Sequence, residues 1–159
     1  MRDRQQAKCF NVRIRQHASF RVGSGELNPD EITALLLIEP DRVGWRGSRS
    51  KEPCIPATNL WSVQSRLKGR VDEMVRDLVD RFEPLRTPLD QLRAAKDSWI
   101  VISVGRHFDV DDGDAEHLDV NDDFEKVPGQ HQLLGFHLDV DLLVRLTRMG
   151  CAVDFDEYG

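Results

Sequence analysis

The stretch FNVRIRQHASFRV, residues 10–22, alternates apolar and polar side chains and is the clearest structural signal in the chain. The even positions are mostly apolar, beginning with Phe10 and ending with Val22. Successive side chains of a strand point to opposite faces, so this pattern predicts a long strand with one apolar and one basic face. The basic face carries Arg13, Arg15, His17 and Arg21.

Helical and strand patterns follow this strand in turn. LNPDEITALLLIEP (27–40) has Asn28 in the N-cap position and Pro29 at the first helical position, which predicts a short helix. VDEMVRDLVDRF (71–82) repeats apolar residues at helical spacing. SWIVISVGRHF (98–108) is apolar on both faces, which is typical of a central strand. We also expect a loop at 41–58, strands at 60–66 and 151–156, and helices at 89–95 and 139–149.

These elements predict one α+β domain over residues 1–159, with an antiparallel or mixed sheet of four to five strands and helices packed on one face. Residues 27–36 and 138–147 align without gaps. That similarity fits a pseudo-twofold strand–helix duplication, and it also fits the common form of any capped amphipathic helix. The other sheet face would be polar, with cross-strand pairs between its arginines and Asp154 and Asp156.

Composition and length indicate a soluble cytoplasmic protein. The longest uninterrupted apolar run, residues 34–38, is far too short to cross a bilayer, and no apolar segment follows the charged start of the chain. The three cysteines form no CxxC pair, which favours a reducing compartment.

Charge is distributed unevenly along the chain. Residues 1–70 hold 13 Arg and Lys against 7 Asp and Glu, whereas residues 71–159 hold 9 against 21. The stretch HFDVDDGDAEHLDVNDDFE (107–125) alone has nine carboxylates in nineteen positions and no lysine or arginine. We interpret it as part of an acidic insertion at about 108–135. Such segregation bears on partners more than on fold.

Common catalytic and metal-binding motifs are missing from the sequence. The acidic stretch fails the calcium-loop pattern, because Gly113 at the sixth position would place Phe108 and Val110 where oxygen ligands belong. The histidines and cysteines lack zinc spacing, and neither a nucleophile elbow nor a phosphate loop is present. We therefore expect no enzyme, no metal and no cofactor.

Nucleic-acid binding is also not expected. The basic strand offers phosphate contacts, but its aromatic residues, Phe10 and Phe20, fall on the apolar face and cannot stack on bases. The acidic second half would repel a polyanion. No membrane partner is expected either.

Several stretches make the chain resemble the bacterial domain-of-unknown-function family four-two-seven-nine. They are SFRV, LNPDEITALLLIEPDR, WRGS, LWSVQSR, VDEMVRDLVDRFEPL and FHLDVDLLVRLTRMGCAVDFDEY, and together they span nearly all of the chain from Ser19 onward. The resemblance implies a small α+β domain without assigned catalytic residues, and some members of the family lie in toxin–immunity neighbourhoods. The chain departs from the family in its long acidic segment, where members usually have a shorter connection.

The first hypothesis is a non-enzymatic protein-binding domain, an immunity protein that blocks a toxin through its acidic loop. Long-range attraction to a basic partner would come from Asp111, Asp112, Asp114, Glu116, Asp122 and Asp123. Trp45 would be the anchor, because tryptophan carries much interface energy, although packing over a sheet edge would equally explain it.

Two alternatives come from other classes. The polar sheet face could serve a ligand-binding domain or a metal-dependent enzyme, with Arg13, Arg15 and Arg21 gripping an anion and His17 lining the cavity. The chain could also be a structural domain that forms a homodimer.

Overall fold

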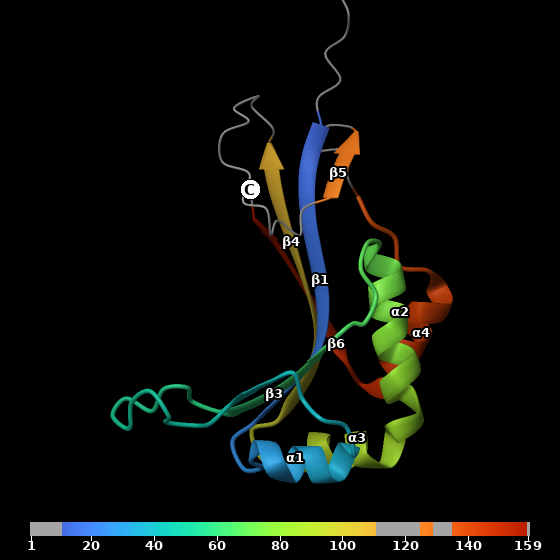
Figure 1. The fold of residues 1–159 in the computed structure, drawn as a ribbon. Coiled ribbons are helices and arrows are strands. Elements are labelled where there is room, and N and C mark those ends of the chain that lie inside the picture. The colour runs from blue at the N-terminus through green and yellow to red at the C-terminus, as the bar shows by residue number, and fades with distance from the viewer. Residues whose placement is uncertain (1–10, 111–124, 129–134, 159) are drawn as a thin grey trace, which may run out of the picture.

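A computed structural model of the chain describes residues 11–110, 125–128 and 135–158. Helices and strands alternate along it as expected for an α+β domain (Figure 1). In chain order the elements are β1 (Asn11–Ser24), α1 (Pro29–Leu36), β2 (Arg42–Gly44), β3 (Asn59–Gln64), α2 (Val71–Phe82), the short 3-10 helix η1 (Glu83–Leu85), α3 (Arg86–Ala94), β4 (Trp99–Val110), β5 (Glu125–Pro128), α4 (Val140–Met149) and β6 (Ala152–Tyr158).

The strands form one open, mixed sheet in the order β2-β3-β1-β4-β6, and β5 also pairs with β1. Neighbouring strands are antiparallel except β4 and β6, which run parallel. Helices α2 and α4 pack against one face, and α1 and α3 close the end of the same core (Figure 1). The predicted α+β class, with a mixed sheet and helices on one face, is confirmed.

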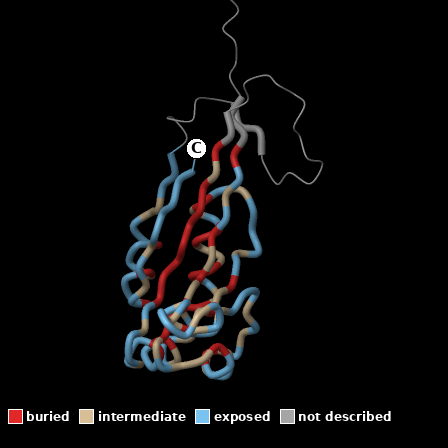
Figure 2. The backbone as a smooth tube through the Cα atoms, turned by 90° about the vertical axis from the view of Figure 1, so that its left-hand side faces the viewer, coloured by how far each residue is buried: buried red, intermediate tan, exposed pale blue. Residues whose placement is uncertain are grey.

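The two longest strands, β1 and β4, form the middle of the sheet. They pair from Val12 opposite Val110 to Gly23 opposite Trp99, and part of this ribbon extends beyond the helices (Figure 1). Every residue from Ile100 to Arg106 is buried, which appears as a continuous red run in Figure 2. This burial explains why β4 is apolar on both faces, as its sequence predicted.

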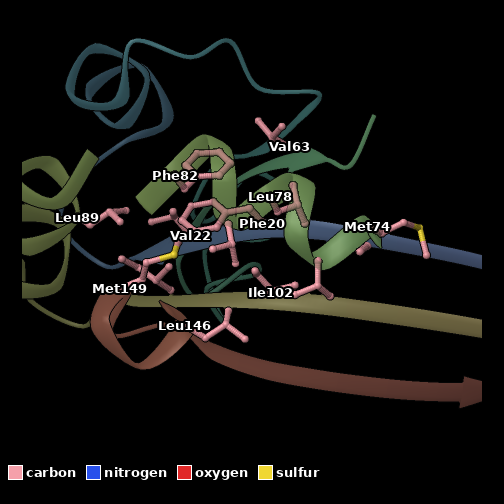
Figure 3. Close-up of a cluster of buried hydrophobic side chains, with 14 of the residues drawn as sticks. Phe20, Val22, Val63, Met74, Leu78, Phe82, Leu89, Ile102, Leu146 and Met149 are labelled. Atoms are coloured by element: carbon pink, nitrogen blue, oxygen red, sulfur yellow. The ribbon is translucent and has the colours of Figure 1, made fainter. Parts of the chain in front are cut away.

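Three aromatic rings occupy the centre of the core. Phe20 stacks on Phe82 with ring centroids 3.8 Å apart, and Trp61 meets both rings edge-on. All three are fully buried. Figure 3 shows Ile102 from the sheet and Met149 from α4 in the same cluster. Burying a side chain of this kind contributes about 1.5–3 kcal/mol each, so the cluster anchors α2 to β1.

The aligned helices α1 and α4 begin in the same way. Asn28 accepts a hydrogen bond from the backbone N–H of Glu31 at 3.0 Å and completes a capping box. Asp139 accepts one from the backbone N–H of Leu142 at 2.8 Å. The strands that follow are paired differently, because β6 runs parallel to β4 whereas β2 runs antiparallel to β3. A duplication of the whole strand–helix unit stays a prediction.

The helices are short, and α2 is the longest of those described, with 12 residues. Within residues 11–110, 125–128 and 135–158, no helix has both the length and the apolar character needed to span a bilayer.

The predicted pairs between the β1 arginines and the β6 aspartates are wrong. β4 lies between β1 and β6, so Asp154 and Asp156 lie opposite Ser103 and Gly105 of β4. The arginines are therefore not cross-strand neighbours of these aspartates. The alternating pattern shows which face a side chain occupies but contains no information on strand order.

Two short strands were not predicted. β2 lies within the stretch predicted to be a loop at 41–58, and β5 lies within the predicted acidic insertion at 108–135. β4 also continues to Val110, two residues past the end of the strand predicted at 98–108. Strands of three or four residues have too little periodicity to be recognised.

Candidate functional site

A pocket of about 610 Å³ opens beside the middle of β1. On this side of β1, β3 pairs with Ser19–Ser24 and β5 pairs with Asn11–Ile14. Between them lies Arg15–Ala18, where the chain leaves β3 and Ser65 donates its backbone N–H to the carbonyl of Ala18 at 2.8 Å. The pocket therefore forms where one partner strand ends before the next begins.

Four basic side chains line this pocket: Arg15 and His17 from β1, Arg42 from β2, and Lys68 from the β3–α2 connection. All four are exposed to solvent. No Asp or Glu is among the described residues that line it. A concave site walled by one sign of charge concentrates the electric field, so we call this site the cationic pocket.

The side chain of Gln16 is fixed at the pocket wall. Its amide nitrogen donates to the carbonyl of Gly69 at 2.7 Å, and its amide oxygen accepts from Nε of Arg106 at 3.0 Å. Arg106 is itself buried and donates to Glu157 at 2.5 Å. These bonds connect the Lys68 loop to the sheet, because Gly69 follows Lys68 directly.

The pKa of His17 reflects the positive charge around the pocket. Its pKa is lowered, first because part of the ring is buried although the residue is largely exposed, and then by the positive potential of His107, Arg15 and Arg42. An anion bound at this position would relieve that repulsion. The shift therefore agrees with a site that attracts negative charge.

Three rings lie side by side on the open sheet face: His17 on β1, His107 on β4 and Tyr158 on β6. The centroids of His17 and His107 are 5.8 Å apart, and those of His107 and Tyr158 are 4.7 Å apart, both pairs being stacked. The His17 ring lies over Gly105, where an added Cβ would be 2.3 Å from Cε1 of the histidine. We call this arrangement the ring row. The row thus takes one ring from each of β1, β4 and β6, which are successive strands of the sheet.

Arg42 also lines another hollow, of about 450 Å³, together with Arg21 and Arg49. Arg21 therefore belongs to the basic face of β1 but not to the cationic pocket. Arg13 lies in β1 opposite Asp109, and its side chain is outside the described part. Of the predicted ligand-gripping residues, the structure places Arg15 and His17 together.

β2 and the connection that leads from it to β3 form the β2–β3 arm (residues 41–58), which projects from the body of the domain (Figure 1). Its base is held by Asn59, which accepts from the backbone N–H of Arg46 at 2.9 Å and donates to the carbonyl of Leu27 at 3.1 Å. The arm exposes three large apolar side chains: Val43 49%, Trp45 43% and Ile55 43%. Trp45 is thus accessible, and its role as an anchor stays a prediction.

The six predicted partner-binding acids lie outside the described residues: Asp111, Asp112, Asp114, Glu116, Asp122 and Asp123. Their segment leaves β4 at Val110, opposite Val12, whereas Trp45 follows β2 at the Ser24 end of β1. These two ends of β1 are about 40 Å apart along the strand at ~3.3 Å per residue.

Metal and thiol chemistry find little support in the described part of the chain. No group of three His, Cys, Asp or Glu residues there could hold a metal ion. Burial raises the pKa of Cys151 to about 12, so its thiol stays protonated at neutral pH. Cys54 lies in the β2–β3 arm, where its thiol donates to the carbonyl of Pro56 at 3.6 Å.

Sequence reasoning missed Gln16, Arg42 and Lys68. Arg42 was placed in an irregular loop, and Gln16 interrupts the apolar face of the first strand. One available signal was the excess of positive charge in residues 1–70, which includes the run RLKGR at 66–70. Which of those charges gather in one pocket depends on strand order.

Fold and site together define a small α+β domain with an open sheet and a cationic pocket at the edge of its central ribbon. Residues 13–159 match the family described as a domain of unknown function (DUF4279), and the chain belongs to this family. Neither a curated protein nor a solved structure matches the chain.

Proposed function

We propose that the chain is a binding domain that holds an anionic ligand in the cationic pocket. One observation carries this proposal: basic side chains from three separate segments, β1, β2 and the β3–α2 connection, converge on one pocket of about 610 Å³. The lining side chains supply positive charge and hydrogen-bond donors. The proposed role is therefore binding and not catalysis.

The geometry suits a compact anion such as a phosphate or carboxylate group. Arg15 and Arg42 each offer a planar set of donors that matches such groups, and Lys68 adds a compact charge. The backbone next to Lys68 is held by the hydrogen bond of 2.7 Å from Gln16 to the carbonyl of Gly69.

Calorimetric titration with inorganic phosphate tests the proposal. We expect saturable binding that weakens with added salt, and an affinity lowered by about tenfold or more in the Arg42→Ala variant, because a charge-assisted hydrogen bond is lost. Arg148→Ala is the matched control, since this arginine is exposed on α4 and does not line the pocket. Equal affinities in the two variants, or no binding at all, would overturn the proposal.

A protein-binding role is the second candidate, and the exposed apolar side chains of the β2–β3 arm favour it. Val43, Trp45 and Ile55 are 43–49% exposed on a projecting segment, as expected for residues that become buried against a partner. The proposed partner is a basic protein such as a cognate toxin, drawn by the six acids that follow β4, and the chain would be its immunity protein. The arm itself carries Arg46, Arg49 and Lys51, so the arm and the acids would contact different parts of that partner.

A pull-down with the product of the neighbouring gene tests this second role. We expect binding of the unchanged chain to weaken with added salt, and we expect it to weaken also when the six acids are changed to their amides. The Trp45→Ala variant should lower binding separately. Arg148→Ala again serves as the control. Binding that is the same in all variants and at all salt concentrations would contradict the role, and gel filtration of the chain alone would reveal a homodimer.

A further inference from the structure

We propose that the ligand of the cationic pocket is an anion that carries a planar ring, as a nucleotide does, and that this ring stacks on the ring row of His17, His107 and Tyr158. This inference rests on the function proposed above. It names the class of ligand that the same site would select.

The first step is that His17 belongs to both features. It lines the cationic pocket, and it also stacks on His107 at 5.8 Å. The row therefore begins at the rim of the pocket, so a ligand held there by its negative charge needs no long linker to reach it. The close approach of the ring to the sheet depends on Gly105, because any Cβ at that position would clash with the histidine.

The second step is that the row continues across the sheet. The parallel register places Tyr158 of β6 opposite His107 of β4, and their rings stack at 4.7 Å. Tyr158 is 52% exposed, His17 is exposed and His107 is half-buried. Part of the row is thus open to solvent, on the sheet face that the helices leave uncovered. Stacking on aromatic side chains is how proteins hold flat bases independently of their sequence.

The third step concerns the orientation of the ligand. Asp154 and Asp156 lie on β6 and are exposed, and their register with Ser103 and Gly105 places them on the same open face. Their negative charge disfavours an anionic group at the β6 end of the row. The anion is therefore directed to the pocket and the uncharged ring to the row, where it would stack on an outer face of His17 or Tyr158, because His107 is already stacked on both sides.

Comparing ligands with and without a ring separates this inference from the proposed function. The probes are inorganic phosphate, adenosine 5′-monophosphate, acetate and benzoate, titrated at equal ionic strength. We expect adenosine monophosphate to bind about tenfold more tightly than phosphate, from the usual contribution of one stacked base. Benzoate that exceeds acetate by a larger factor would identify an aromatic carboxylate as the ligand type instead.

Two substitutions of one residue make the test specific. Tyr158→Ala should lower the affinity for the monophosphate severalfold and leave the affinity for phosphate unchanged, whereas Tyr158→Phe keeps the ring and should retain both. His107→Ala should behave as Tyr158→Ala does, with circular dichroism to check that each variant is folded. If phosphate binds and responds to Arg42→Ala while neither ring-bearing probe binds more tightly than its ringless partner, this inference is overturned and the proposed function stands. If none of the probes binds, both fail.

Discussion

The two faces of the sheet carry different chemistry although they belong to the same strands. On the covered face of β1, Phe20 and Val22 are fully buried against the helices. On the open face, Arg15 and His17 are exposed and Arg21 is partly so. The covered face is specified by packing, which tolerates only apolar side chains of suitable volume. The open face has no such constraint, and it carries the ring row and contributes Arg15 and His17 to the cationic pocket.

The covered face changes character where β1 and β4 extend past the helices. There Gln16 lies opposite Arg106, and Arg106 is only 3% exposed. Its guanidinium lies 4.9 Å from the Phe108 ring centroid and 5.3 Å from that of Phe136, and it donates to Glu157 at 2.5 Å. A buried charge is stable only when it is paired and hydrogen-bonded. Polar packing thus continues the covered face beyond the apolar core.

The largest expected effect comes from removing a ring of the apolar core. Phe82→Ala should lower the free energy of unfolding by about 3–5 kcal/mol, because Phe82 is fully buried and stacks on Phe20. Urea unfolding followed by tryptophan fluorescence measures it. Asp154→Ala, on the open face, should change stability by no more than about 0.5 kcal/mol. If both variants lost similar stability, the contrast between the faces would be wrong.

The buried charge on the covered face should give a smaller effect. Glu157→Gln removes the carboxylate that faces Arg106 and should cost about 1–2 kcal/mol of unfolding free energy, a magnitude limited by the partial exposure of Glu157. Asp156→Asn is the matched control, because Asp156, which precedes Glu157 in β6, points to the open face and is exposed. Urea unfolding of both variants at pH 7 provides the comparison. Equal stabilities would show that Glu157 does not stabilise the buried arginine.

Local pattern predicted much of this fold. The alternation at 10–22 and the apolar run at 98–108 identified β1 and β4, and the helical spacing at 71–82 gave the bounds of α2. Those signals are strong because each long element has one buried side or two. β2 and β5 were not predicted at all, because these strands are very short.

The candidate site was less predictable than the fold. The pattern placed Arg15 and His17 on the polar face. The other basic residues of the pocket, Arg42 and Lys68, are far from them in the sequence. The order β2-β3-β1 brings Arg42 towards Arg15 and His17, and the order β1-β4-β6 separates the arginines from Asp154. Strand order depends on long-range pairing and on helix packing, neither of which has a local periodic signature.

The smallest expected effect concerns the protonation of His17 on the open face. Its pKa in the folded chain lies below the ordinary value of 6.5, because burial and the positive groups of His107, Arg15 and Arg42 disfavour its charged form. Between the lowered pKa and 6.5, the unfolded chain binds a proton at this residue that the folded chain does not. The contribution of His17 to stability should therefore increase as the pH rises through that window and stay constant above it.

Titration of the His17 ring by nuclear magnetic resonance measures this shift directly. We expect a midpoint below 6.5, which moves upward in the Arg42→Gln variant because one source of positive potential has been removed, and upward again when phosphate occupies the pocket. His17→Gln should flatten the dependence of unfolding free energy on pH in the same window. A midpoint at or above 6.5 in the unliganded protein would contradict the positive potential assigned to the pocket. A midpoint that phosphate leaves unchanged would mean that the anion binds away from His17. In that case His17 would not connect the anion-binding pocket to the ring row.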